Sequence, residues 1–99
     1  MSYRIRVSAA AQEDLERQFE FLAANDLPSA VRARDAIEKA YELVEAMPFA
    51  CRKAEESNPF LRELVISFGS AGYVALFEVE DEKTVTILAI RHQREEDFL

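Results

Sequence analysis

Apolar and polar positions alternate along several short stretches of the chain and recur at helical spacing along two longer ones. Tyr3 to Val7 alternates aromatic or aliphatic residues with arginine, which is typical of a half-buried edge strand. Three later stretches are also rich in β-branched and aromatic residues and are separated by turn signals. We therefore expect further strands at Leu61–Phe68, Tyr73–Val79 and Thr84–Arg91, with turns at Gly69–Gly72 and Glu80–Lys83.

Two helices are expected between the first strand and the second. Ser8 is a suitable N-cap for a helix that runs to about Asn25, and early acidic residues favour the helix dipole. Asp26 can cap a second helix that has Pro28 in its first turn, and Pro48 ends it. Because only a few residues join the two helices, we expect them to pack antiparallel as a hairpin.

The order of these elements is strand, helix, helix, strand, strand, strand. It predicts one α+β domain over residues 1–99, in which an N-terminal helical hairpin packs on one face of a small antiparallel sheet. Phe49–Pro59 is rich in polar residues, and we interpret it as a long connection without secondary structure.

Both faces of the last two strands are largely apolar. Strict alternation places Ile87 and Ala89 on one face of the last strand, and Leu88 and Ile90 on the other. The helical hairpin can cover only one face of the sheet, because each helix has a single apolar stripe. We expect another chain to cover the second face; the C-terminal tail or a shared homodimer surface are the alternatives.

Charge narrows the range of partners. The net charge of −7 argues against unaided binding along a nucleic-acid backbone, which requires Lys and Arg to neutralise phosphates. A cationic surface must therefore be small and formed by folding. The candidate contributors are Arg52, Lys53, Arg62, Arg91 and Arg94.

Several classes of protein are excluded by composition. Cys51 is the only cysteine, so no intrachain disulfide can form, and a reducing cytosol is the simplest home. One Cys and one His are too few for a zinc site, and we predict neither a metal nor another cofactor. No apolar run approaches the ~20 residues of a membrane span, and the first residues do not form a signal peptide. We therefore expect a cytoplasmic protein with no membrane association.

The chain resembles a known family over essentially its whole length, and most specifically in its second half. Leu61-Arg62-Glu63-Leu64, Phe68-Gly69, Tyr73–Phe77 and Ile87–Glu95 are similar to the core of the RelE/ParE superfamily, and most similar to its ParE type. These proteins are the toxins of bacterial type II toxin–antitoxin modules, often labelled plasmid stabilisation proteins. The resemblance implies the fold expected above and a cognate ParD-like antitoxin, with which the chain would form a hetero-oligomer.

The superfamily contains two mechanisms. ParE-type toxins inhibit DNA gyrase by stabilising its broken-DNA state and have no known catalysis of their own. RelE-type toxins enter the ribosome and cleave messenger RNA without a metal. We expect the ParE-like activity, because Glu95, Glu96 and Asp97 would repel an RNA phosphate at the end of the last strand. Ribosome-dependent RNA cleavage is the alternative.

The resemblance also assigns candidate site residues. For a nuclease they are Arg62, Arg91 and His92, with His92 as acid or base because Phe98 replaces the terminal tyrosine of RelE and has no hydroxyl. For target contact they are Arg91, His92, Arg94 and Arg62.

Structural roles compete with these assignments. Arg62 could pair with a cross-strand acid such as Glu78, and the His92 ring could bond to a strand or a nearby carboxylate. For the antitoxin, the candidate contacts are Tyr73, Leu76, Leu88 and Ile90.

Overall fold

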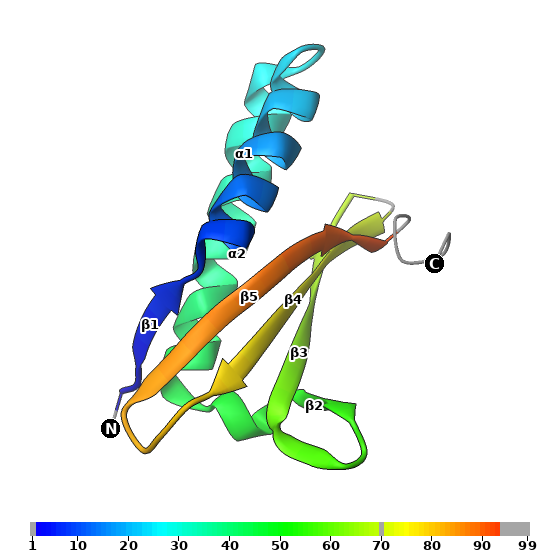
Figure 1. The fold of residues 1–99 in the computed structure, drawn as a ribbon. Coiled ribbons are helices and arrows are strands. Elements are labelled where there is room, and N and C mark those ends of the chain that lie inside the picture. The colour runs from blue at the N-terminus through cyan, green and yellow to red at the C-terminus, as the bar shows by residue number, and fades with distance from the viewer. Residues whose placement is uncertain (1, 70, 94–99) are drawn as a thin grey trace.

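Figure 1 shows the fold, given by a computed structural model that describes residues 2–69 and 71–93. Its elements are β1 (Arg4–Val7), α1 (Ala9–Ala23), α2 (Leu27–Ala46), the short 3₁₀ helix η1 (Pro48–Ala50), β2 (Arg52–Glu55), β3 (Asn58–Phe68), β4 (Ala71–Val79) and β5 (Thr84–His92). Both helices lie on one face of the sheet, and the turn between them projects past it. This arrangement confirms the α+β fold predicted from the sequence.

The five strands form one sheet in the order β1-β5-β4-β3-β2. Strands β3, β4 and β5 pair antiparallel with one another, as predicted, and β2, which was not predicted, pairs antiparallel with β3. The edge strand β1 pairs parallel with β5. The sheet is therefore mixed. No tight hairpin joins β1 to β5, so their orientation is not constrained to be antiparallel.

The core fills the space between the helical hairpin and the sheet. Six of its residues are completely buried: Ala11 from α1, Val44 from α2, Phe77 from β4, and Val85, Ile87 and Ile90 from β5. Burial of a large aliphatic or aromatic side chain contributes about 1.5–3 kcal/mol, so these residues fix the hairpin on this face.

The helices begin at the predicted caps. Ser8 Oγ accepts a hydrogen bond from the backbone N–H of Ala11 at 3.1 Å, and Asp26 Oδ1 accepts one from Ser29 N–H at 3.2 Å. These bonds satisfy donors that the first turn of a helix leaves without an intrahelical acceptor. Helix α1 ends at Ala23, two residues before the predicted end.

The connection predicted over Phe49–Pro59 contains secondary structure, so that prediction was wrong. It holds η1 and β2, and β3 already begins at Asn58. Strand β2 pairs antiparallel with β3, and Arg52 Nε donates to Glu63 Oε1 at 2.7 Å across the pair. Strand β2 is a short, charged edge strand, and it therefore lacks the alternation of apolar and polar residues by which half-buried strands are recognised in a sequence.

The predicted alternation along β5 was also wrong. Leu76 is paired with Ala89 and Phe77 with Ile87, so Leu88 is an extra residue in β5 and forms a β-bulge. Ile87 and Ile90 consequently both face the core, although they are three residues apart, and Ala89 is only half-buried. The bulge reverses the facing of every residue that follows it.

Candidate functional site

The described end of β5 presents two neighbouring candidate residues on opposite faces of the sheet. Arg91 is paired with Val74 and is exposed on the outer face, away from the helices. His92 is paired with Tyr73 and is half-buried on the inner face. The His92 ring packs edge-on against the Tyr73 ring, with centroids 5.5 Å apart and an interplanar angle of 86°. Arg94 and Phe98 lie outside the described residues.

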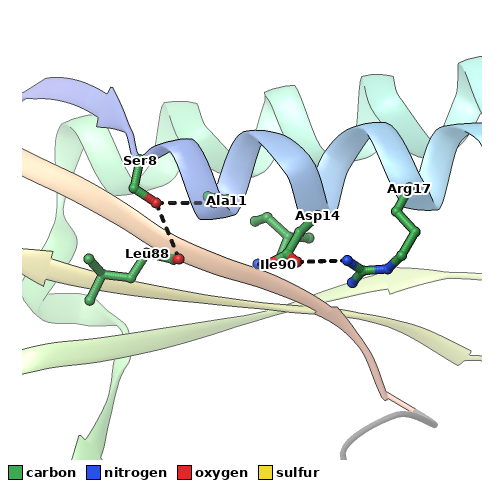
Figure 2. Close-up of polar contacts among 6 residues, drawn as sticks. All are labelled: Ser8, Ala11, Asp14, Arg17, Leu88 and Ile90. Atoms are coloured by element: carbon green, nitrogen blue, oxygen red, sulfur yellow. Dashed lines mark hydrogen bonds and ion pairs between the residues drawn. The ribbon is translucent and has the colours of Figure 1, made fainter.

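The part of β5 that carries Arg91 is bonded to the start of α1 (Figure 2). Ser8 Oγ donates to the carbonyl oxygen of Leu88 at 3.3 Å, and Asp14 Oδ2 accepts from the N–H of Ile90 at 3.0 Å. Asp14 Oδ1 also pairs with Arg17 Nη1 at 3.1 Å. The sequence predicts only a role within α1 for Ser8 and for the early acidic residues, of which Asp14 is one, because no residue near them in the sequence indicates a partner so far along the chain.

Arg62 lies far from Arg91 and His92. Arg62 is paired with Phe77, and His92 is paired with Tyr73, four residues away along β4. At roughly 3.3 Å per residue, Phe77 and Tyr73 are about 13 Å apart along the strand, and Arg62 and His92 lie on opposite sides of β4. Arg62 and His92 lie on the inner face and Arg91 on the outer one. The three candidate nuclease residues are therefore not brought together.

The Arg62 guanidinium is bonded to backbone carbonyls near η1. Its Nε donates to Pro59 O at 2.7 Å and its Nη1 to Cys51 O at 2.8 Å, and its carbon atom lies 5.1 Å from the centre of the Phe49 ring. These contacts replace the pairing with Glu78 that was considered from the sequence. They tie η1 to β3, which is a structural role for Arg62.

The four candidate antitoxin contacts fall into two environments. Leu76 and Leu88 are half-buried, and Figure 2 shows the Leu88 side chain directed away from α1. Tyr73 and Ile90, with 2% and 0% of their surface exposed, belong to the core on the helical side. Only Leu76 and Leu88 are thus available on the uncovered side of the sheet.

Tyr73 does border a hollow of about 490 Å³ that is lined mainly by residues of the two helices. Phe19 from α1 and Ile37 and Tyr41 from α2 also line it. The Tyr41 hydroxyl is buried and, among the described residues, has no hydrogen-bond partner.

The outer face of the sheet combines an apolar centre with charged edges. Val65, Leu76 and Leu88 contribute to the centre, and Val65 remains 38% exposed. Arg6 on β1 and Arg52 on β2 lie at the edges, where Arg6 Nη1 is 3.8 Å from Glu80 Oε2. Such a surface is suited to a protein partner with an apolar segment and polar flanks.

The described part of the chain offers neither an activated thiol nor a metal-ligand group at these surfaces. Burial raises the pKa of the Cys51 thiol, which outweighs the opposite effect of the Arg62 charge, so the reactive thiolate is disfavoured. Residues 2–69 and 71–93 contain no group of three or more His, Cys, Asp or Glu side chains placed to hold a metal ion. None of their helices is long and apolar enough to cross a membrane.

Comparison with known proteins identifies the family. The fold is similar to that of a chain in the chromosomal ParDE system from P. aeruginosa, with a TM-score of 0.72 and 17% identity, covering 92% of this chain and 96% of that chain. It is also similar to a chain of the RelBE2 toxin–antitoxin complex from Mycobacterium tuberculosis, with a TM-score of 0.60 and 23% identity, covering 94% of this chain and 100% of that chain. No curated protein sequence matches significantly. The model of the family described as "ParE toxin of type II toxin-antitoxin system, parDE" matches residues 5–97. The chain therefore belongs to the family of ParE toxins of type II toxin–antitoxin systems.

Proposed function

We propose that this toxin inhibits DNA gyrase through a protein–protein contact and has no catalytic activity of its own. The observation that carries the proposal is the placement of the cationic residues. Arg91 is exposed on the outer face, whereas Arg62 is bonded to backbone carbonyls elsewhere on the sheet. One rim-exposed arginine suits recognition of a protein surface.

The alternative, ribosome-dependent RNA cleavage, requires a different arrangement. A base, a cationic group and an acid must converge on one phosphate within hydrogen-bond reach. Arg91 and His92 are neighbours in sequence, but they face opposite sides of β5, and Arg62 lies at a distant register position. This geometry favours gyrase inhibition, which also places the proposed action in the cytoplasm.

We further propose that a ParD-like antitoxin neutralises the toxin by covering two surfaces. An apolar segment on the outer face would contact Leu76 and Leu88, and a second segment would enter the hollow beside Tyr73 and Tyr41. Both surfaces have apolar side chains that no described element of the toxin covers. Burial of these side chains provides the driving force for a hetero-oligomer.

A supercoiling assay tests the gyrase proposal. Purified toxin added to gyrase, ATP and relaxed plasmid should inhibit supercoiling and yield linear DNA after denaturation of the protein. Arg91→Ala should require about tenfold more toxin, since removal of one well-placed charged contact costs on the order of 1–3 kcal/mol. The matched control is Lys39→Ala, which removes an exposed cation from α2.

The same protein should be tested on programmed ribosomes. Intact messenger RNA together with linear DNA in the gyrase assay supports the proposal. Codon-associated cuts that disappear in His92→Ala or Arg62→Ala, with unaffected gyrase, would replace it with the RelE-like activity.

A further inference from the structure

The β-bulge in β5 determines which side of the sheet Arg91 occupies. A regular strand that continues from the Phe77–Ile87 pair would place Ile90 opposite Val74 and Arg91 opposite Tyr73. Arg91 would then point toward the helices, and Ile90 would leave the core. With Leu88 as the extra residue, Arg91 pairs with Val74 instead and is exposed on the outer face.

A bulge of this kind disrupts regular pairing and needs other partners for its backbone. Strand β1 pairs with β5 only as far as Val7 and Ile87. Beyond that point the polar groups on this edge of β5 have no neighbouring strand among the described residues. A buried N–H or C=O without a partner costs about 1–3 kcal/mol, so an unsupported bulge would be free to revert to a regular strand.

The start of α1, which follows β1 directly in the chain, supplies the missing hydrogen-bond partners (Figure 2). Ser8 N–H donates to Ile87 O at 3.0 Å, its Oγ donates to Leu88 O at 3.3 Å, and Asp14 Oδ2 accepts from Ile90 N–H at 3.0 Å. Three successive polar positions of the β5 edge are thus bonded to Ser8 and Asp14. The Asp14 side chain is only 17% exposed, and its Oδ1 is paired with Arg17.

We propose that Ser8 and Asp14 are positioning residues that hold the β5 bulge in the register that turns Arg91 outward. The functional part of this inference rests on the proposed contact of Arg91 with gyrase. Asp14 makes the stronger contribution, because a carboxylate that accepts from a backbone N–H forms a charge-assisted hydrogen bond. Neither residue touches the target; both act through the orientation of β5.

Cross-strand NOEs in the isotopically labelled toxin report the register directly. The wild type and the control Glu13→Ala, which removes an exposed carboxylate from the same helix, should show Val74 opposite Arg91. Asp14→Ala should show a population with Val74 opposite Ile90, and hydrogen exchange at the Ile90 amide should accelerate at least about tenfold. Asp14→Asn retains a carbonyl acceptor and should restore most of the native pairing. If Asp14→Ala does not fold, Ser8→Ala provides the same comparison with a smaller change.

A suppressor variant separates positioning from a purely stabilising role. Deletion of Leu88 removes the extra residue, so regular alternation then places Arg91 outward without support from α1. In the gyrase assay, Asp14→Ala should lose about tenfold in inhibition, and combining it with the Leu88 deletion should recover activity. The hydrogen bond from Ile90 N–H to Asp14 is still missing in the combined variant, so recovered inhibition would reflect the orientation of Arg91 and not restored stability.

Two results would overturn the proposal. One is native Val74–Arg91 pairing with slow Ile90 exchange in Asp14→Ala. The other is a combined variant that folds with Arg91 outward and remains as inactive as Asp14→Ala. If wild-type toxin fails to inhibit gyrase, the proposed function fails, whereas the NOE and exchange comparison still decides whether α1 sets the orientation of Arg91.

Discussion

Arg62 and Arg91 show how one residue type serves two purposes in a small domain. The planar guanidinium of Arg62 donates in two directions, to Pro59 O and Cys51 O, and packs on Phe49. Lysine cannot reproduce this geometry, because its N–H donors all lie on one nitrogen atom and not on a planar group. Arg91 is exposed and contributes little to packing. Its proposed role is to contact the target protein.

Tyr41 leads to a prediction about stability at high pH. Burial, and secondarily the Glu38 charge, raises the pKa of Tyr41 from 10.0 to about 12. Since the folded chain keeps the phenol proton to a higher pH than the unfolded chain, this contribution to stability is complete below pH 10 and is lost as the pH rises toward about 12. Tyr41→Phe should therefore show a shallower loss of stability across this range.

Urea denaturation of both proteins, below pH 10 and between pH 10 and about 12, measures the difference. Other tyrosines and lysines titrate in both proteins and cancel in the comparison. Equal loss in the two proteins would show that Tyr41 does not contribute. Because the Tyr41 hydroxyl has no hydrogen-bond partner among the described residues, Tyr41→Phe should cost little stability at neutral pH.

At the scale of elements, the β3–β4 hairpin depends on two glycines for different reasons. Gly69 has a φ of 61°, a conformation that other residues rarely adopt, but the space around its Cα is open. Gly72 lies within the pairing of β3 with β4, where a Cβ atom would overlap the backbone carbonyl oxygen of Ile66. The backbone cannot move away without breaking the strand pairing.

Gly72→Ala should therefore destabilise the protein more than Gly69→Ala. We expect a loss of about 2–4 kcal/mol at Gly72, from overlap in a packed sheet, and about 1–2 kcal/mol at Gly69, from the left-handed conformation. Thermal and urea unfolding of the two variants measure this order. The reverse order would mean that β4 can shift away from β3 at Gly72.

At the scale of the whole molecule, the helical hairpin covers one face of the sheet, and no described element covers the other. The outer face keeps an apolar centre that includes Val65, Leu76 and Leu88, between edges that carry charged residues. The −7 charge of the chain favours partners with basic segments and opposes contact with nucleic acid alone. Both properties suit a protein antitoxin and a protein target.

Leu76→Ala tests whether the outer face binds the antitoxin. Truncation of an apolar side chain at the centre of an interface should weaken binding by about tenfold or more, while the half-buried position keeps the toxin folded. Calorimetric titration with the cognate antitoxin measures the affinity. Ser67→Ala is the matched control, since Ser67 is exposed on the same face of the sheet as Leu76. Equal affinities for the three proteins would assign antitoxin binding to the hollow beside Tyr73 instead.

The sequence by itself determined both helices, four of the five strands and the order in which they follow one another, but not η1 or β2. The caps at Ser8 and Asp26 and the end of the second helix before Pro48 depend on residues within a few positions, and the structure has them. The turn predicted over Gly69–Gly72 is shorter than expected, because Ala71 and Gly72 already belong to β4 and pair with β3. The resemblance to the family was likewise recognisable from the segments between Leu61 and Glu95. Local periodicity records these features because neighbouring residues share the same helix or strand.

Only the tertiary structure decided the strand pairings that place the candidate site. The bulge at Leu88, the parallel pairing of β1 with β5 and the separation of Arg62 from Arg91 depend on contacts between distant parts of the chain. The bond from Ile90 to Asp14 spans 76 positions, and that from Ser8 to Leu88 spans 80. No window of neighbouring residues contains both partners of such a bond, so the facing of Arg91 is settled only when α1 packs against the edge of β5.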